Sequence, residues 1–135
     1  MNNKSPSGSL CPYYFMGGEL HPLHYGNYYS NKQKLFEIIK KEENFILNSA
    51  GLNNRRIWID LYKTIMDKEV IKMLVNHIGN IKQKINKICL VGCSPIVVQK
   101  IKFRIKQENL NLLSPLKYFA DPEEAKQWLI GKNAV

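Results

Sequence analysis

Residues 55–70, which read RRIWIDLYKTIMDKEV, decide the fold of this chain. Apart from Asp60, residues 57–61 are apolar, β-branched or aromatic, which is typical of a strand covered on both faces. Asp67 then precedes an apolar stripe with helical spacing: Val70, Ile71, Leu74, Val75, Ile78, Ile81 and Ile85. Its carboxylate is suited to accept from the unpaired amides of a first helical turn. The stretch therefore predicts a strand, a loop and a helix N-terminus, at the sheet edge where α/β proteins usually bind ligands.

The totals predict one small domain. The chain has 135 residues, of which 44% are hydrophobic, and its apolar runs are much shorter than a membrane span. Residues 1–10 are polar and lack a hydrophobic signal segment, so we expect a frayed tail there, a domain over 11–131 and a short tail over 132–135. An odd count of three cysteines argues against a secreted disulfide framework, and a cytoplasmic location is expected.

The positive charge is unevenly distributed. Residues 1–54 hold five basic and four acidic side chains, whereas residues 55–135 hold fifteen and seven, so +8 of the net +9 lies in the second part. Such a field favours an acidic protein surface, an anionic lipid headgroup or nucleic acid. For the run 82–106, with seven basic residues and no acid, solubilising lysines are favoured slightly over a dedicated nucleic-acid surface.

Strand and helix signals alternate along the chain. Strands are expected at 12–16, 57–61, 87–92 and 116–119, with a loop at 21–29. Helix starts are expected at Ser30 (with Gln33 as a capping box), Asp67, Ser94 with Pro95, and Asp121 with Pro122, and a stop at Gly131. This alternation predicts an α/β fold with a mostly parallel sheet of four to five strands and helices packed on it.

Several pieces of the sequence resemble the STAS domain, the fold of anti-sigma-factor antagonists and of sulfate-transporter cytoplasmic tails. The likeness is closer to small bacterial proteins of the STAS/SEC14-like branch, and it covers roughly residues 18–130. The pieces are Gly18-Glu19-Leu20, residues 57–61 with Met66-Asp67, residues 91–97, and the ending 118–129. The resemblance implies a single-domain STAS-like fold and a regulatory protein that acts by docking.

The resemblance also implies a phosphorylated serine in the loop before the second helix, and this chain departs from it there. The corresponding run is 67–70, and the acceptor position is occupied by Glu69, which has no hydroxyl. A glutamate is favourable at a helix N-terminus and carries roughly half the charge of a phosphoserine. We therefore expect docking without the serine phospho-switch.

Candidate metal and nucleophile sites are weak. His21 and His24, with Cys11 nearby, suit zinc, but no second pair stands at ligand spacing, and solvated loop histidines are the favoured interpretation. Cys93 and Ser94 precede a helix start and form a candidate anion site, where a lowered thiol pKa is a minority alternative. No Ser-His-Asp or Cys-His set can be placed, so no catalytic residue, metal or cofactor is predicted.

The sequence thus predicts a non-catalytic interaction domain that docks an acidic protein partner. The expected contact residues are Thr64, Asp67, Lys68, Glu69 and Lys72. The alternative is a carrier or sensor of a small anionic or lipid-like ligand, which predicts an apolar pocket near the end of the central strand with Lys or Arg at its mouth. Nucleic acid is the third and least favoured partner.

Overall fold

The computed structural model describes residues 3–7, 10–11, 13–15, 18–28, 31–48, 55–112 and 115–131. Its main sheet has five strands: β3 (Tyr13–Phe15), β4 (Gly18–His24), β5 (Arg55–Asp60), β6 (Ile85–Val91) and β7 (Leu116–Phe119). Four α-helices alternate with the strands from β4 onward: α1 (Lys32–Leu47), α2 (Lys68–Ile81), α3 (Pro95–Gln107) and α4 (Pro122–Ile130). Short 3-10 helices cover Tyr25–Tyr28 (η1) and Lys82–Lys84 (η2).

The sheet is parallel except at one edge. Strands β4, β5, β6 and β7 lie side by side in chain order and run parallel, while β3 pairs antiparallel with β4. Trp58 in β5 pairs with Pro22 in β4 and with Cys89 in β6, which places β5 in the interior of the sheet. The predicted α/β fold with a mostly parallel sheet of four to five strands is confirmed.

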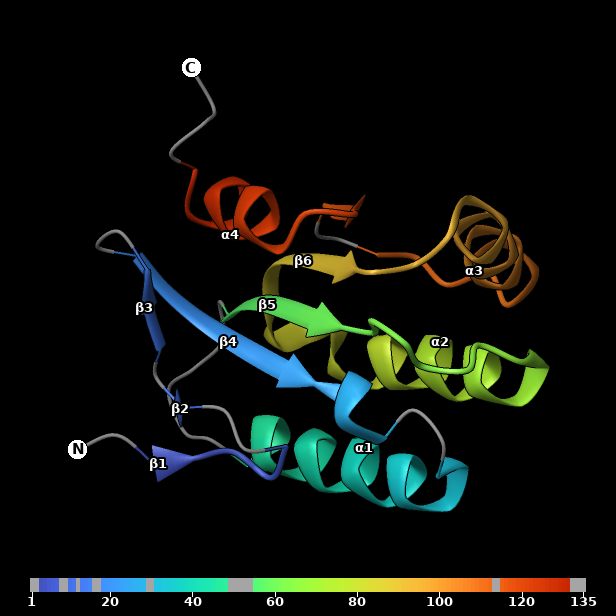
Figure 1. The fold of residues 1–135 in the computed structure, drawn as a ribbon, viewed down its shortest axis with the longest axis horizontal. Coiled ribbons are helices and arrows are strands. Elements are labelled where there is room, and N and C mark those ends of the chain that lie inside the picture. The colour runs from blue at the N-terminus through green and yellow to red at the C-terminus, as the bar shows by residue number, and fades with distance from the viewer. Residues whose placement is uncertain are drawn as a thin grey trace.

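Helices cover both faces of the sheet (Figure 1). Because β4 to β7 progress in one direction, right-handed crossovers place α1, α2 and α3 on the same face. Their side of the sheet holds the larger core, which includes Ile57, Ile59, Leu74, Ile88 and Ile101. The alternate strand residues point the other way, where Leu20, Trp58 and Cys89 pack against Ala125 and Leu129 of α4.

The predicted helix caps are largely confirmed. Asp67 Oδ1 accepts from the Val70 amide at 2.9 Å, and Asp121 Oδ1 accepts from the Glu123 amide at 3.0 Å. Gly131 ends α4 with a φ of +78°. The start of α1 differs from the prediction: Asn31, not Ser30, caps this helix by accepting from the Lys34 amide at 3.1 Å, and Ser30 lies outside the described residues.

Strand β4 corrects the expectation of a loop at 21–29. Residues up to His24 continue the strand and η1 follows. Pro22 lacks an amide hydrogen, but its nitrogen points away from β5, so no hydrogen bond between β4 and β5 is lost. This direction follows from His24, because alternate amides of a strand point to the same side. The His24 amide donates to Ser7 Oγ at 3.1 Å, away from β5, and the nitrogen of Pro22 faces the same way.

The N-terminal residues correct a second expectation. Strand β1 (Asn3–Lys4) pairs with β2 (Leu10–Cys11), and Ser5 and Ser7 are buried rather than part of a frayed tail. Both hydroxyls donate to Oε2 of Glu42 in α1, from Ser5 at 2.8 Å. The described part of residues 1–10 therefore belongs to the folded domain, whereas the predicted tail 132–135 lies outside the described residues.

Candidate functional site

The loop from β5 to α2 lies at the carboxyl ends of the parallel strands and is held firmly. Asp60 Oδ1 accepts from the Tyr62 amide at 2.9 Å, and the Thr64 amide donates to the Leu61 carbonyl at 2.9 Å. Gly26 and Gly92 approach the backbone of Tyr62 so closely that a Cβ would lie 2.5 Å from its carbonyl oxygen and 2.8 Å from its Cα, respectively. The loop is therefore positioned by its neighbours before any partner arrives.

The start of α2 is tied to the start of α1 by one lysine. Lys32 Nζ lies 2.6 Å from Asp67 Oδ2 and 2.9 Å from Glu69 Oε1. The hydrogen bond from Lys32, followed by that from the Val70 amide, holds the pKa of Asp67 below its ordinary value. Asp67 and Glu69 in turn raise the pKa of Lys32. Lys32 is thus shared by the two carboxylates that the loop presents and offsets one of their two negative charges.

A groove of about 570 Å³ lies between α2 and α3. We call it the α2–α3 groove; its apolar part is formed by Ile71, Ile96 and Phe103, and its polar part by Lys68, Lys100 and Arg104 with Gln99 and Gln107. Ile96 and Phe103 are 69% and 66% exposed, values at which an aliphatic or aromatic side chain on a folded domain contributes nothing to the core. Apolar and basic groups therefore line one open surface.

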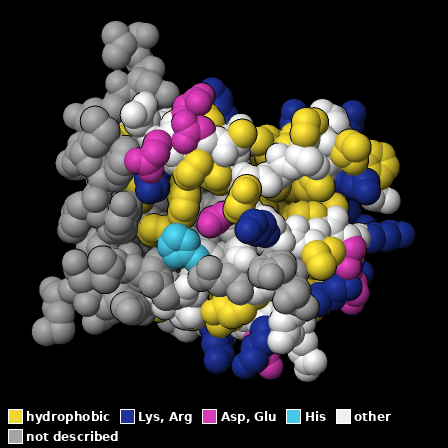
Figure 2. Space-filling model, in the orientation of Figure 1, with side chains coloured by type: hydrophobic (Ala, Val, Ile, Leu, Met, Phe, Trp, Pro, Cys, Tyr) yellow, Lys and Arg dark blue, Asp and Glu magenta, His cyan; other side chains and the backbone are white. Residues whose placement is uncertain are grey.

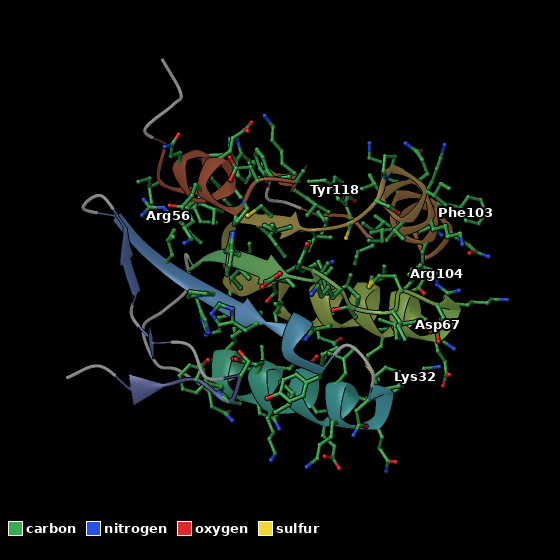
Figure 3. All side chains as sticks on the ribbon, in the orientation of Figure 1. Lys32, Arg56, Asp67, Phe103, Arg104 and Tyr118 are labelled. Carbon is green, nitrogen blue, oxygen red and sulfur yellow. The ribbon has the colours of Figure 1, made fainter. Side chains whose placement is uncertain are left out.

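A second hollow of about 460 Å³ continues this groove toward the loop. Asp67, Glu69 and Lys72 line it, and it shares Lys68 and Arg104 with the α2–α3 groove. Figure 3 shows Lys32, Asp67, Arg104 and Phe103 succeeding one another along one end of the molecule, where α1, α2 and α3 meet. In Figure 2 the same end carries hydrophobic side chains interleaved with dark blue lysines and arginines.

The charge balance of this surface is positive. Within the described part of the chain, Lys68, Lys72 and Lys100 form no ion pair, whereas Arg104 is paired with Glu108 one turn further along α3. Lys32 offsets one of the two negative charges of Asp67 and Glu69, and the three lysines outweigh the one that remains, so the field that a partner meets is positive. An anionic partner is therefore favoured at this groove.

The structure brings together four of the five residues predicted to bind a partner. Asp67, Lys68, Glu69 and Lys72 line the second hollow. Thr64 does not join them: its side chain is half-buried and its hydroxyl oxygen is shielded from solvent. Thr64 therefore shapes the loop, and its predicted role in direct contact lacks support from its position.

Sequence reasoning missed the groove residues on α3. Ile96, Lys100, Phe103 and Gln107 follow one another at spacings of four, three and four residues, which is one helical face. Val97, Ile101 and Ile105 form the separate stripe that packs on the core. Two apolar residues on the solvent-facing stripe were the signal available in the sequence, because a helix needs only one apolar face to pack on a sheet.

Two predictions concern Cys93 and Ser94: a reactive thiol and an anion site. Burial raises the pKa of Cys93 to about 11, so the minority expectation of a lowered pKa is wrong. Ser94 Oγ accepts from the Val97 amide at 3.3 Å, which uses one of the amides that an anion would otherwise bind. The anion site itself stays a prediction.

His21 and His24 both lie in β4 rather than in a loop, and His21 is buried rather than solvated. His21 is only 2% exposed, and its Nε2 lies 3.6 Å from Glu42 Oε1. His24 packs edge-on against Trp58, on the opposite face, because residues three apart in a strand point to opposite sides. A single ion cannot reach both rings, and among the described residues no three His, Cys, Asp or Glu side chains gather as a metal site.

A second histidine is buried between α1 and α2. His77 Nδ1 lies 3.0 Å from Glu43 Oε1, and its Nε2 lies 2.7 Å from the Tyr25 hydroxyl. Burial, and then the carboxylates of Glu42 and Glu43, raise the pKa of Tyr25 well above its ordinary value. Tyr25 and His77 are 0% and 1% exposed, so this network joins η1, α1 and α2 in the interior of the domain.

The basic run at 82–106 does not form one surface. Lys100 and Arg104 line the α2–α3 groove, whereas Lys87 lies on the α4 side, where its ammonium donates to the Trp128 carbonyl at 3.1 Å and sits 5.1 Å from the Trp128 ring centre. A duplex backbone would need these charges along one path. This arrangement gives no support to nucleic acid as the partner.

Comparison of the chain with protein-family models, with curated proteins and with solved structures finds no match. The helices of the described residues are all too short or too polar to cross a lipid bilayer.

Proposed function

We propose that the chain is a non-catalytic docking domain of STAS-like kind that binds an acidic protein partner in the cytoplasm. The observation that carries this proposal is the α2–α3 groove, in which exposed Ile96 and Phe103 lie among Lys68, Lys100 and Arg104. Apolar contact supplies affinity, while the basic rim selects an acidic partner and raises its association rate.

The position of the groove also supports the proposal. Its second hollow contains Asp67, Lys68, Glu69 and Lys72, the loop and helix start for which the sequence predicts a docking role. The β5–α2 loop beside it is held by hydrogen bonds and by close packing of Gly26 and Gly92. Such a surface loses little conformational entropy on binding.

Constitutive docking, without a serine switch, is part of the proposal. Glu69 stands where the resemblance places the phosphoacceptor, and its carboxylate lies 2.9 Å from Lys32 Nζ. A carboxylate at this position needs no kinase, and it is paired with a lysine of the same chain. Binding at this surface is therefore expected to follow partner concentration rather than a kinase.

The experiment is affinity capture from native lysate with a set of variants. Phe103→Ser and Lys100→Glu alter the groove, while Leu47→Ser and Lys40→Glu change an exposed apolar and an exposed basic residue of α1. We expect an acidic protein to be captured by the wild type and by both α1 variants, and to be lost from both groove variants. Capture that is the same with all five proteins would contradict docking at the groove.

A carrier or sensor of a small anionic or lipid-like ligand is the second candidate function. The apolar surface of Phe103 and Ile96 beside Lys100 and Arg104 favours it, because an acyl chain and an anionic headgroup need the same two chemistries. The groove lies between two helices, however, rather than at the end of β5 where this alternative predicts a pocket. A thermal-shift screen with anionic lipids and nucleotides tests it, with Phe103→Ser as the matched variant.

A further inference from the structure

We propose that the occupant of the α2–α3 groove is an acidic amphipathic helix of the partner, about three turns long. Its apolar side chains would rest on Ile71, Ile96 and Phe103, and its carboxylates would face Lys68, Lys100 and Arg104. This inference rests on the proposed docking function and names the part of the partner that binds.

The backbone chemistry of the groove favours a helix. Within the described part of the chain, the groove is lined by residues of α2 and α3, and most of their main-chain amides and carbonyls are used within the helices. An extended peptide has unpaired backbone groups, and it binds well where a sheet edge can pair with them. Of the lining side chains, those of Gln99 and Gln107 can both donate to a peptide carbonyl and accept from a peptide amide, whereas Lys68, Lys100 and Arg104 can only donate. A helix satisfies its own backbone and brings only side chains to the contact.

The length of the contact follows from α3. The exposed stripe runs from Ile96 to Gln107, which at 1.5 Å per residue is roughly 16 Å, or about three helical turns. Three helices packed in this way bury apolar side chains between them at the usual interaxial distance of roughly 8–10 Å. An apolar residue about every third or fourth position of the partner would meet Ile96 and Phe103 in turn.

The positions of Lys100 and Arg104 determine the spacing of carboxylates that a partner helix needs. Lys100 and Arg104 are four residues apart on α3, so they lie on one side of the helix about one turn apart. Carboxylates at i and i+4 of an antiparallel partner helix match that separation. Arg104 already binds Glu108 within α3, and a partner carboxylate would replace or share that contact.

The test uses two pools of 15-residue acetylated peptides with the same composition of Leu, Phe, Glu, Asp and Ala. One pool places the apolar residues at helical spacing, and the other places them at every second position. Binding to the immobilised full chain is followed by sequencing of the retained peptides. We expect at least tenfold enrichment of the helical pool, and a gain of helical circular dichroism when a selected peptide binds.

Variants of the chain then locate the site. Phe103→Ser and Lys100→Glu are each expected to weaken a selected peptide at least tenfold, while Leu47→Ser and Lys40→Glu leave it unchanged. Equal retention of the two pools, or binding that is indifferent to Phe103→Ser, would overturn the helix. Vesicles of phosphatidylglycerol and phosphatidylcholine form the last arm: Phe103-dependent binding to vesicles without peptide retention would identify a membrane as the occupant instead.

The two proposals fail in different ways. If capture of an acidic protein from lysate depends on the groove but the helical pool is not enriched, the docking function stands and the helix is wrong. If neither assay responds to Phe103→Ser and Lys100→Glu, both are wrong.

Discussion

Lys32 Nζ lies 2.6 Å from Asp67 Oδ2, so the first residue of α1 is bound to the residue that caps α2. Lys32→Met is expected to raise the pKa of Asp67 toward its ordinary value, because the hydrogen bond from Lys32 is the main cause of its lowering. The measurement is a carboxyl ¹³C NMR titration of the wild type and the variant. The free energy of unfolding should change little, since the pair is exposed to solvent and screened by it.

Lys34→Met is the control for that titration, because Lys34 is also on the first turn of α1 but pairs with Glu37. An Asp67 pKa that is the same in Lys32→Met and the wild type would show that the capping bond alone lowers it.

Removal of the Tyr25 hydroxyl should destabilise the domain. Tyr25→Phe leaves the buried Nε2 of His77 without its partner at 2.7 Å. A buried polar atom left unsatisfied costs about 1–3 kcal/mol, which urea denaturation followed by circular dichroism will measure. Tyr62→Phe is the matched control, because Tyr62 is 62% exposed, and it should be nearly neutral. Equal effects of the two substitutions would argue against a structural role for the hydroxyl.

Alanine substitutions at two glycines with positive φ allow the cost of backbone strain to be measured separately from the cost of a steric clash. Gly92 has a φ of +90°, and a Cβ there would lie 2.8 Å from the Cα of Tyr62, whereas Gly131 has a φ of +78° with open space around it. Gly131→Ala should cost about 1–2 kcal/mol from the left-handed conformation alone. Gly92→Ala should cost clearly more, because the β5–α2 loop must also move. Thermal unfolding of both variants tests this order, and a smaller loss for Gly92→Ala would contradict it.

Glu42 should make stability depend on pH. Burial by itself raises the pKa of Glu42, but the neighbouring imidazole of His21 and hydrogen bonds from Ser7 and Ser5 outweigh burial and lower it. A carboxyl with a lowered pKa contributes stability above its unfolded pKa of about 4.3, and this contribution is lost as the pH falls through the folded-state pKa. Glu42→Gln should therefore cost about 1–3 kcal/mol at pH 7 and progressively less below about pH 4.

Denaturation of wild type and Glu42→Gln at several pH values measures this difference. Glu37→Gln is the control, since Glu37 is an exposed residue of the same helix, and its effect should be small at every pH. A loss in Glu42→Gln that stays constant between pH 3 and pH 7 would show that Glu42 is not ionised in the fold.

The features predicted correctly from the sequence are those fixed by neighbouring residues. Asp67, Ser94 and Asp121 cap helices because each has amides within three residues of its own oxygen. Trp58 and Ile59 are interior because a β-branched and aromatic strand of the parallel kind is covered on both faces. Local chemistry is enough to place such elements.

The features that were missed depend on distant segments. The strand character of β4 was hidden because Pro22 and two histidines are typical of a loop, and only the distant Ser7 and Glu42 explain why they are tolerated. The groove needed the pairing of α2 with α3, and the compensation of Asp67 needed Lys32, which is 35 residues away. A single sequence carries no direct record of such contacts.

Among the described residues, α4 is the helix that covers the second face of the sheet, and this has a consequence for synthesis of the protein. Each of β4 to β7 joins its predecessor in chain order, so the sheet and the helices α1, α2 and α3 are able to assemble as the chain leaves the ribosome. Trp58 and Cys89 gain their partners Ala125 and Leu129 only when α4 emerges. Until translation passes Pro122–Ile130, the nascent chain carries a bare apolar sheet, which is the surface that chaperones recognise.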